Sequence, residues 1–165
     1  VFVDVFRAPE WFTTIFALIA MFMAAASLLN SRIVGRLGMR RVSHGALLAY
    51  IGLTGLHALL AWSGYEALWS FAILQGGTMF CFGLVAPNFG AMAMDPLGHV
   101  AGTASSVQGF VTTIVGALLG FYIGQHFDGT VLPLTLSVAL CGVAALGIVL
   151  VAEKGRLFRP SAGRH

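Results

Sequence analysis

The sequence has little charge. Only 9% of its 165 residues are Asp, Glu, Lys or Arg, whereas a soluble globular domain has about 25%. A soluble chain of this length needs a largely polar surface, because most of its residues cannot reach a core. With 58% hydrophobic residues, the chain instead suits a protein whose outer surface contacts lipid.

The sequence also lacks the motifs of common catalytic sites. It has no P-loop, no HExxH, no GxSxG and no paired carboxylates. Its two cysteines, Cys81 and Cys141, lie alone in apolar stretches, where small packing residues are expected. No spacing of Cys, His or acidic residues is typical of a metal site. We therefore expect no enzyme, no cofactor, no metal and no ATP-driven transport by this chain.

What the sequence does contain is five long apolar stretches. About 20 apolar residues are needed for a helix to cross the hydrocarbon. Every Lys, Arg, Asp and Glu falls between or beyond these stretches, and none shows strand-like alternation. The predicted fold class is therefore all-α integral membrane, with five transmembrane helices at about 11–31, 42–62, 67–94, 100–125 and 131–152.

The basic residues predict the orientation. Eight of the nine fall in the connection after the first stretch or in the C-terminal tail. Four predicted crossings separate these two segments, so they lie on the same side of the membrane. Loops rich in Lys and Arg face the cytoplasm, so the N-terminus is expected outside and the C-terminus inside. Basic residues clustered beside apolar spans indicate a membrane and not a nucleic acid as the partner. The two clusters are Arg32, Arg36, Arg40 and Arg41, and Lys154, Arg156, Arg159 and Arg164.

The first connection carries the most specific motif. It runs from Ser31 to Val42 as SRIVGRLGMRRV, and its glycines indicate a tight turn among arginines. It resembles the loop motif G-x-L-x-D-R-x-G-R-[KR] of the major facilitator superfamily. The matching residues are Arg36, Gly38, Arg40 and Arg41, whereas Ser31, Gly35 and Met39 replace the first Gly, the Asp and the second Arg of the motif.

Three further segments resemble one subfamily of this superfamily. Ala86-Pro87-Asn88, Asp95-Pro96-Leu97-Gly98 and the segment AGTASS from Ala101 to Ser106 are similar to those of Bcr/CflA (bicyclomycin-resistance) drug:proton antiporters. The resemblance implies helices 8 to 12 of a twelve-helix carrier in a bacterial inner membrane, with the N-terminal half missing. It divides the chain into the end of helix 7 with its outer loop (1–10), a five-helix bundle (11–152) and a cytoplasmic basic tail (153–165).

The implied function is proton-coupled efflux of drugs or other small molecules by alternating access. Two alternatives remain open from the residues alone: a metabolite permease of the same superfamily, and a non-transporting membrane subunit. No Asp or Glu lies inside a span, so the coupling carboxylate is expected in the missing half. His57 is the titratable residue well inside a span. We weigh a role in proton coupling against a hydrogen-bonded structural role for it.

Polar residues at membrane depth mark candidate sites. Gln75, Met79 and Phe82 share one helical face and suit a broad, mostly apolar drug cavity. Asn88 and Gln108 are further candidates. Each could instead serve packing, and Asn88 could satisfy the carbonyl freed by Pro87. A candidate helix-packing face carries Gly109, Gly116, Gly120 and Gly124.

Overall fold

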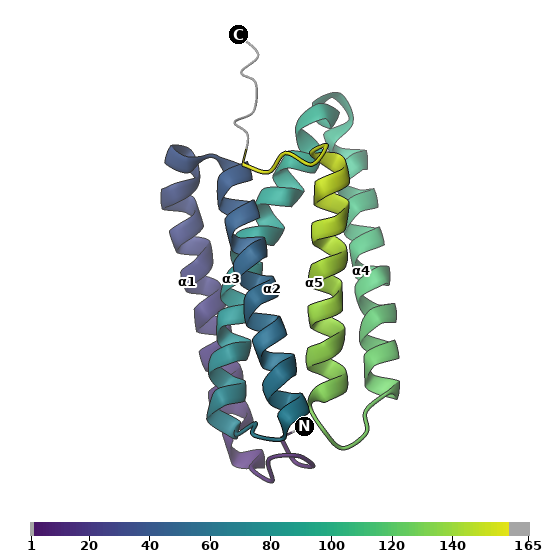
Figure 1. The fold of residues 1–165 in the computed structure, drawn as a ribbon. Helices are drawn as coiled ribbons and strands as arrows, with labels where there is room; N and C mark the ends of the chain where they lie inside the picture. The colour runs from purple at the N-terminus through teal and green to yellow at the C-terminus, as the bar shows by residue number, and fades with distance from the viewer. Residues whose placement is uncertain (1, 159–165) are drawn as a thin grey trace.

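The computed structural model describes residues 2–158 as a bundle of helices (Figure 1). Of the predicted basic tail, residues 159–165 lie outside the described part, and with them Arg159 and Arg164. The described residues contain five α-helices and no strand. The helices are α1 (Phe12–Leu37), α2 (Met39–Ser63), α3 (Leu68–Met94), α4 (Ala101–Gln125) and α5 (Leu132–Ala152), with two short 3-10 helices, η1 (Pro9–Trp11) and η2 (Asp95–Val100).

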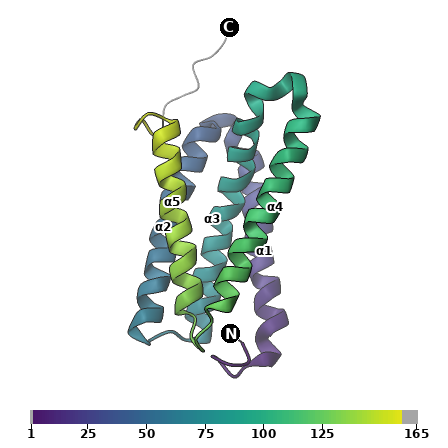
Figure 2. The same ribbon diagram turned by 90° about the vertical axis from the view of Figure 1, so that its right-hand side faces the viewer.

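The helices have the length and composition of membrane spans. Four helical segments of the described chain are long and apolar enough to cross a bilayer. One of them, Leu68–Gln125, is 58 residues long and contains α3, η2 and α4. In Figures 1 and 2 the chain reverses direction at η2, so that α3 and α4 run in opposite directions. The chain is therefore a multi-pass membrane protein in a lipid bilayer.

The first connection differs from the prediction. The sequence indicated a basic loop between Ser31 and Val42, but α1 continues to Leu37 and α2 begins at Met39. Gly38 alone joins them, with φ +82° and ψ 147°, a backbone conformation close to a region that is essentially restricted to glycine. Its N–H still donates to the Val34 carbonyl at 2.8 Å. The arginines of the motif therefore lie on helix ends and not on a loop.

The core lies where α3 packs between α1 and α2. Ala26, Val42, Ala46 and Leu84 form its buried cluster. Small residues let the helices approach closely. Such close packing is usual between membrane helices, because lipid tails are as apolar as the helices and no hydrophobic effect drives the helices together. A Cβ on Gly83 would lie 2.9 Å from the Ala26 Cβ and 3.2 Å from the Met23 carbonyl oxygen.

By contrast, α4 is only loosely attached. It has no buried residue, and in Figure 2 it lies at the edge of the bundle, on the near side of α3 and beside α5. A hypothetical Cβ on any glycine of the predicted packing face meets no other atom within 4 Å. Within the described residues, that face is therefore unoccupied. The face comprises Gly109, Gly116, Gly120 and Gly124.

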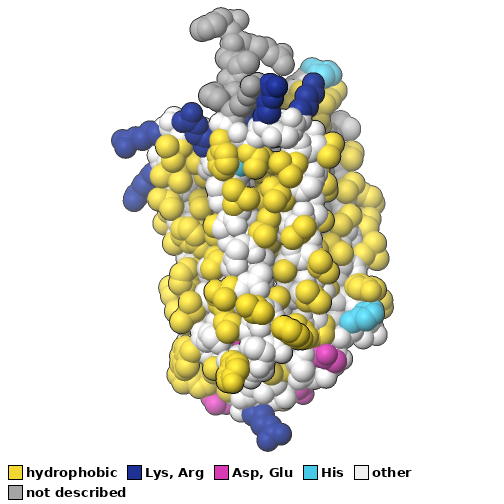
Figure 3. All heavy atoms as spheres, viewed as in Figure 1, with side chains coloured by type: hydrophobic (Ala, Val, Ile, Leu, Met, Phe, Trp, Pro, Cys, Tyr) yellow, Lys and Arg dark blue, Asp and Glu magenta, His cyan; other side chains and the backbone are white. Residues whose placement is uncertain are grey.

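The two ends of the bundle differ in charge. On the face seen in Figure 3, most Lys and Arg side chains lie at one end, and the visible acidic side chains lie at the other end together with a single basic one. The acidic end also carries exposed aromatic residues, with the Trp11 and Trp69 ring centroids 5.1 Å apart. The exposed aromatic residues are Trp11, Trp62, Tyr65 and Trp69, and amphipathic rings of this kind are enriched at membrane interfaces.

Candidate functional site

The predicted cavity face of α3 is partly open. Gln75 and Met79 are half-buried, whereas Phe82 is 45% exposed and Ala86 is exposed. These four residues recur at helical spacing and lie on one side of α3. On the opposite side, α3 packs against α2 at Gly77, where a Cβ would lie 3.2 Å from Leu53. The face therefore remains available to a ligand or to a further helix.

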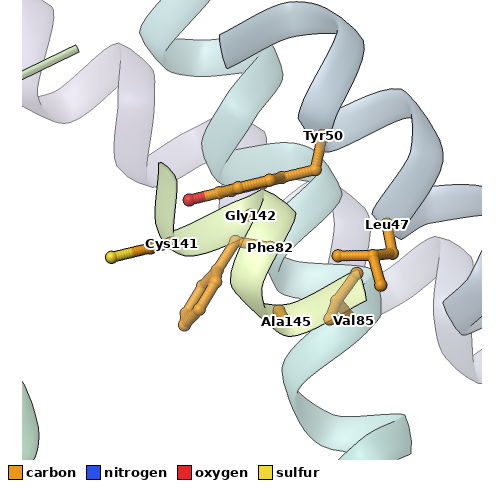
Figure 4. A pocket seen from close by; sticks show the side chains of 7 residues that line it. All are labelled: Leu47, Tyr50, Phe82, Val85, Cys141, Gly142 and Ala145. Carbon is orange, nitrogen blue, oxygen red and sulfur yellow. The ribbon is translucent and has the colours of Figure 1, made fainter. Parts of the chain in front are cut away.

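Phe82 also lines a small apolar groove. The groove has a volume of about 160 Å³ and is formed by side chains from α2, α3 and α5 (Figure 4). The Tyr50 hydroxyl is the polar side-chain group drawn there, apart from the Cys141 thiol. Such a lining suits an apolar group and not a charged one. It comprises Leu47, Tyr50, Phe82, Val85, Cys141, Gly142 and Ala145.

A larger cavity lies next to it, at the basic end. Its volume is about 530 Å³, and it shares Ala145 with the first groove. Its polar lining residues are Arg40 and Glu153, whose side chains form an ion pair with Nε and Oε1 3.2 Å apart. The remaining lining residues are Phe89, Met92, Ala93, Ile148, Val149 and Ala152.

Asn88 is buried against α1. Its Nδ2 donates to Asn30 Oδ1 at 2.7 Å and to the Leu84 carbonyl at 2.7 Å, and its Oδ1 accepts from Asn30 Nδ2 at 3.3 Å. Pro87 removes the helical donor of the Gly83 carbonyl, and Asn88 bonds to a different carbonyl. The expectation that Asn88 satisfies the carbonyl freed by Pro87 is therefore wrong. The pair instead joins α1 to α3.

Gln108 lies between α3 and α4. Its side-chain Nε2 would be 3.6 Å from a Cβ placed on Gly90. Gln108 is half-buried, and it approaches α3 two residues beyond Asn88. The five predicted cavity residues therefore fall into three groups on α3 and α4: the open face, the Asn30–Asn88 pair and the α3–α4 contact.

The loop-motif residues have different surroundings. Arg36 and Arg41 are exposed, whereas Arg40 pairs with Glu153 just beyond α5. Close by, the Phe158 N–H donates to His44 Nδ1 at 3.0 Å. His44 itself is only 1% exposed. The N-terminal end of α2, which carries part of the loop motif, therefore binds the segment that follows α5.

Sequence reasoning missed one buried carboxylate. Glu66 lies in the α2–α3 connection, outside the spans, but its side chain is only 5% exposed and its Oε1 lies 2.5 Å from His57 Nε2. Burial raises its pKa to about 7. His57 is hydrogen-bonded, and its partner is Glu66. The sequence carried one signal for this contact: His57 precedes Glu66 by only nine residues, and Glu66 lies in a short connection between two helices.

The chain is similar to a known protein. It is 29% identical over 150 residues to a bicyclomycin resistance protein homolog of Haemophilus influenzae. The match is consistent with the predicted resemblance to the C-terminal part of a Bcr/CflA-type major facilitator transporter. It covers 88% of this chain and 37% of the relative, so the chain spans little more than a third of that protein.

Other comparisons add no relative. No protein family model matches the chain. No solved structure matches it either.

Proposed function

We propose that the chain forms helices 8 to 12 of a twelve-helix major facilitator transporter, which expels drugs or other small molecules in exchange for protons. The observation that carries the proposal is the similarity to a bicyclomycin resistance protein homolog across 88% of the chain. The apolar helices support it. The exposed faces of α3 and α4, which a second half of the protein could cover, support it as well. A carrier of this kind is not an enzyme, and its partners are a small-molecule substrate, protons and an N-terminal half.

The proposed setting is the bacterial inner membrane. Lys and Arg gather at the end where α1 is joined to α2 (Figures 1 and 3), and basic segments stay in the cytoplasm. That end would therefore be cytoplasmic. Residues 1–10 would form the end of helix 7 and an outer loop, 11–152 the bundle and 153–165 a cytoplasmic tail.

The proposed mechanism is alternating access, in which two halves rock around a site at mid-membrane. The unoccupied glycine face of α4 and the open face of α3 are the surfaces this chain offers to a second half. Gln75, Met79 and Phe82 would contact the substrate on α3, with Gln108 beside them. Asn88 would act by holding α1 to α3, because its amide atoms are already bonded there.

At the cytoplasmic end, the motif would shape the gate. Gly38 turns the chain between α1 and α2, and Arg40 ties α2 to Glu153. Exposed Arg36 and Arg41 remain free to contact lipid headgroups or the other half. Rocking of the halves would then break and remake contacts at these arginines while the bundle itself stays rigid.

A cell-based efflux assay tests the substrate face. We expect Gln75→Ala and Phe82→Ala, made in the full-length protein, to lower efflux of ethidium or bicyclomycin by about tenfold, because one lost hydrogen bond or apolar contact to a ligand is worth about 1–2 kcal/mol. Ile73→Ala, on an exposed part of α3 away from this face, is the matched control.

Expression of each variant is measured alongside efflux. Unchanged export of every substrate tried by both variants, at normal expression, would contradict the assignment of the substrate face. Loss of export by the control variant as well would show that the assay reports folding and not the site.

A further inference from the structure

The buried pair at the acidic end of the bundle has the geometry of a proton-binding site. Glu66 Oε1 and His57 Nε2 are 2.5 Å apart, a separation that accommodates a single shared proton. Both side chains are almost fully buried, at 5% and 3% exposed. The other carboxyl oxygen, Glu66 Oε2, is buried without a hydrogen-bond partner in the described structure.

The unpartnered Oε2 atom indicates whether the buried Glu66 side chain is neutral or charged. A buried carboxylate needs partners for both oxygens, and leaving one unsatisfied costs more when the group is charged. A neutral carboxylic acid bonded to a neutral imidazole meets the geometry best. Removing the proton would leave a buried anion, and adding a second would leave a buried cation. The pair therefore holds one proton.

Aromatic side chains cover the His57 side of the pair, and no other charged residue of the described chain is buried beside it. The Phe71 ring lies edge-on to His57, with centroids 5.3 Å apart. Phe2 and Phe6 of the N-terminal segment cover Phe71 in turn, at 5.9 and 5.4 Å. The helices α1 and α3 contribute no charged residue at this end. The other titratable residues here are all exposed: Asp4, Arg7, Glu10, Tyr65, Tyr122, His126 and Asp128.

We propose that Glu66 and His57 form a proton-binding site, which holds one proton between Oε1 and Nε2 and exchanges it with water beside the 64–67 connection. The raised pKa of Glu66, about 7, supports exchange in the physiological range. The site stands on the local geometry and does not depend on drug transport. It also places a protonatable carboxylate in this chain, although no Asp or Glu lies inside a span.

Infrared difference spectroscopy of the full-length protein in lipid nanodiscs tests the site. We expect a carboxylic-acid C=O band that disappears as pH rises through about 7, and that is absent from Glu66→Gln. Glu10→Gln, an exposed carboxyl at the same end, should leave the band unchanged. A spectrum in which Glu66→Gln removes no titrating acid band would overturn the proposal.

A second variant keeps the test decisive if Glu66→Gln does not fold. His57→Leu removes the partner of Oε1 at nearly constant volume, so the Glu66 anion loses a donor and its pKa should rise by about one unit or more. A midpoint that stays in place would refute a proton shared with His57. Neither measurement reads drug export, so the result is separate from that of the efflux assay.

Discussion

Replacing Gly83 by valine should destabilise the folded protein by about 1–3 kcal/mol, the usual cost of overpacking a tight contact. The first carbon of the new side chain would lie 2.9 Å from the Ala26 Cβ and 3.2 Å from the Met23 carbonyl oxygen. Neither atom is the end of a flexible side chain, so α1 and α3 must move apart. Reversible SDS-induced unfolding in mixed micelles measures the loss.

Gly147→Val is the matched control, because a Cβ at position 147 of α5 meets nothing within 4 Å. The same added volume should there change stability by less than about 0.5 kcal/mol, as for most surface substitutions. Equal losses in the two variants would mean that valine acts through helix propensity. The close approach of α1 and α3 would then not explain the result.

The second large effect is expected at the Asn30–Asn88 pair. Asn88→Leu should cost about 1–2 kcal/mol, because it leaves the Asn30 amide without its partner in an apolar setting. Asn30→Leu should cost a similar amount. The double variant should lose less than the sum of the two, since it removes both polar groups together.

A double-mutant cycle on the same unfolding assay measures this coupling. A coupling energy of about 0.5–1.5 kcal/mol is the expected result for an interhelical hydrogen-bonded pair. Strict additivity would contradict the pair as an energetic link between α1 and α3. The cycle also separates a packing role of Asn88 from a substrate contact, because the coupling to Asn30 requires no substrate.

The helices could be predicted well from the sequence, because their signal is local. Uninterrupted apolar runs of about 20 residues and clustered arginines require no tertiary information. The predicted third stretch, 67–94, and the observed α3, Leu68–Met94, differ by one residue at the start. The predicted glycine turn is present at Gly38, but α1 and α2 extend further toward it than the apolar stretches do. Arginines at the end of a membrane helix can extend into the headgroups, so the helix does not end where the apolar residues end.

The contacts between helices could not be predicted in the same way. Gly83 and the α4 glycines are alike in sequence, but Gly83 meets α1 whereas those of α4 meet nothing within 4 Å. Likewise, the Glu66 side chain turns inward from a polar connection to reach His57. Which residues meet depends on the rotation of each helix about its axis, and the weak amphipathicity of lipid-exposed helices carries little information on that rotation.

The proposed function of this chain is to form part of a proton-driven exporter. Its most direct test is transport by the purified full-length protein in liposomes with an imposed proton gradient. We predict that ethidium or bicyclomycin moves against its concentration gradient when the gradient is present, and that a protonophore abolishes this movement. Substrate movement that never exceeds equilibration, with or without the proton gradient, would contradict a proton-coupled exporter.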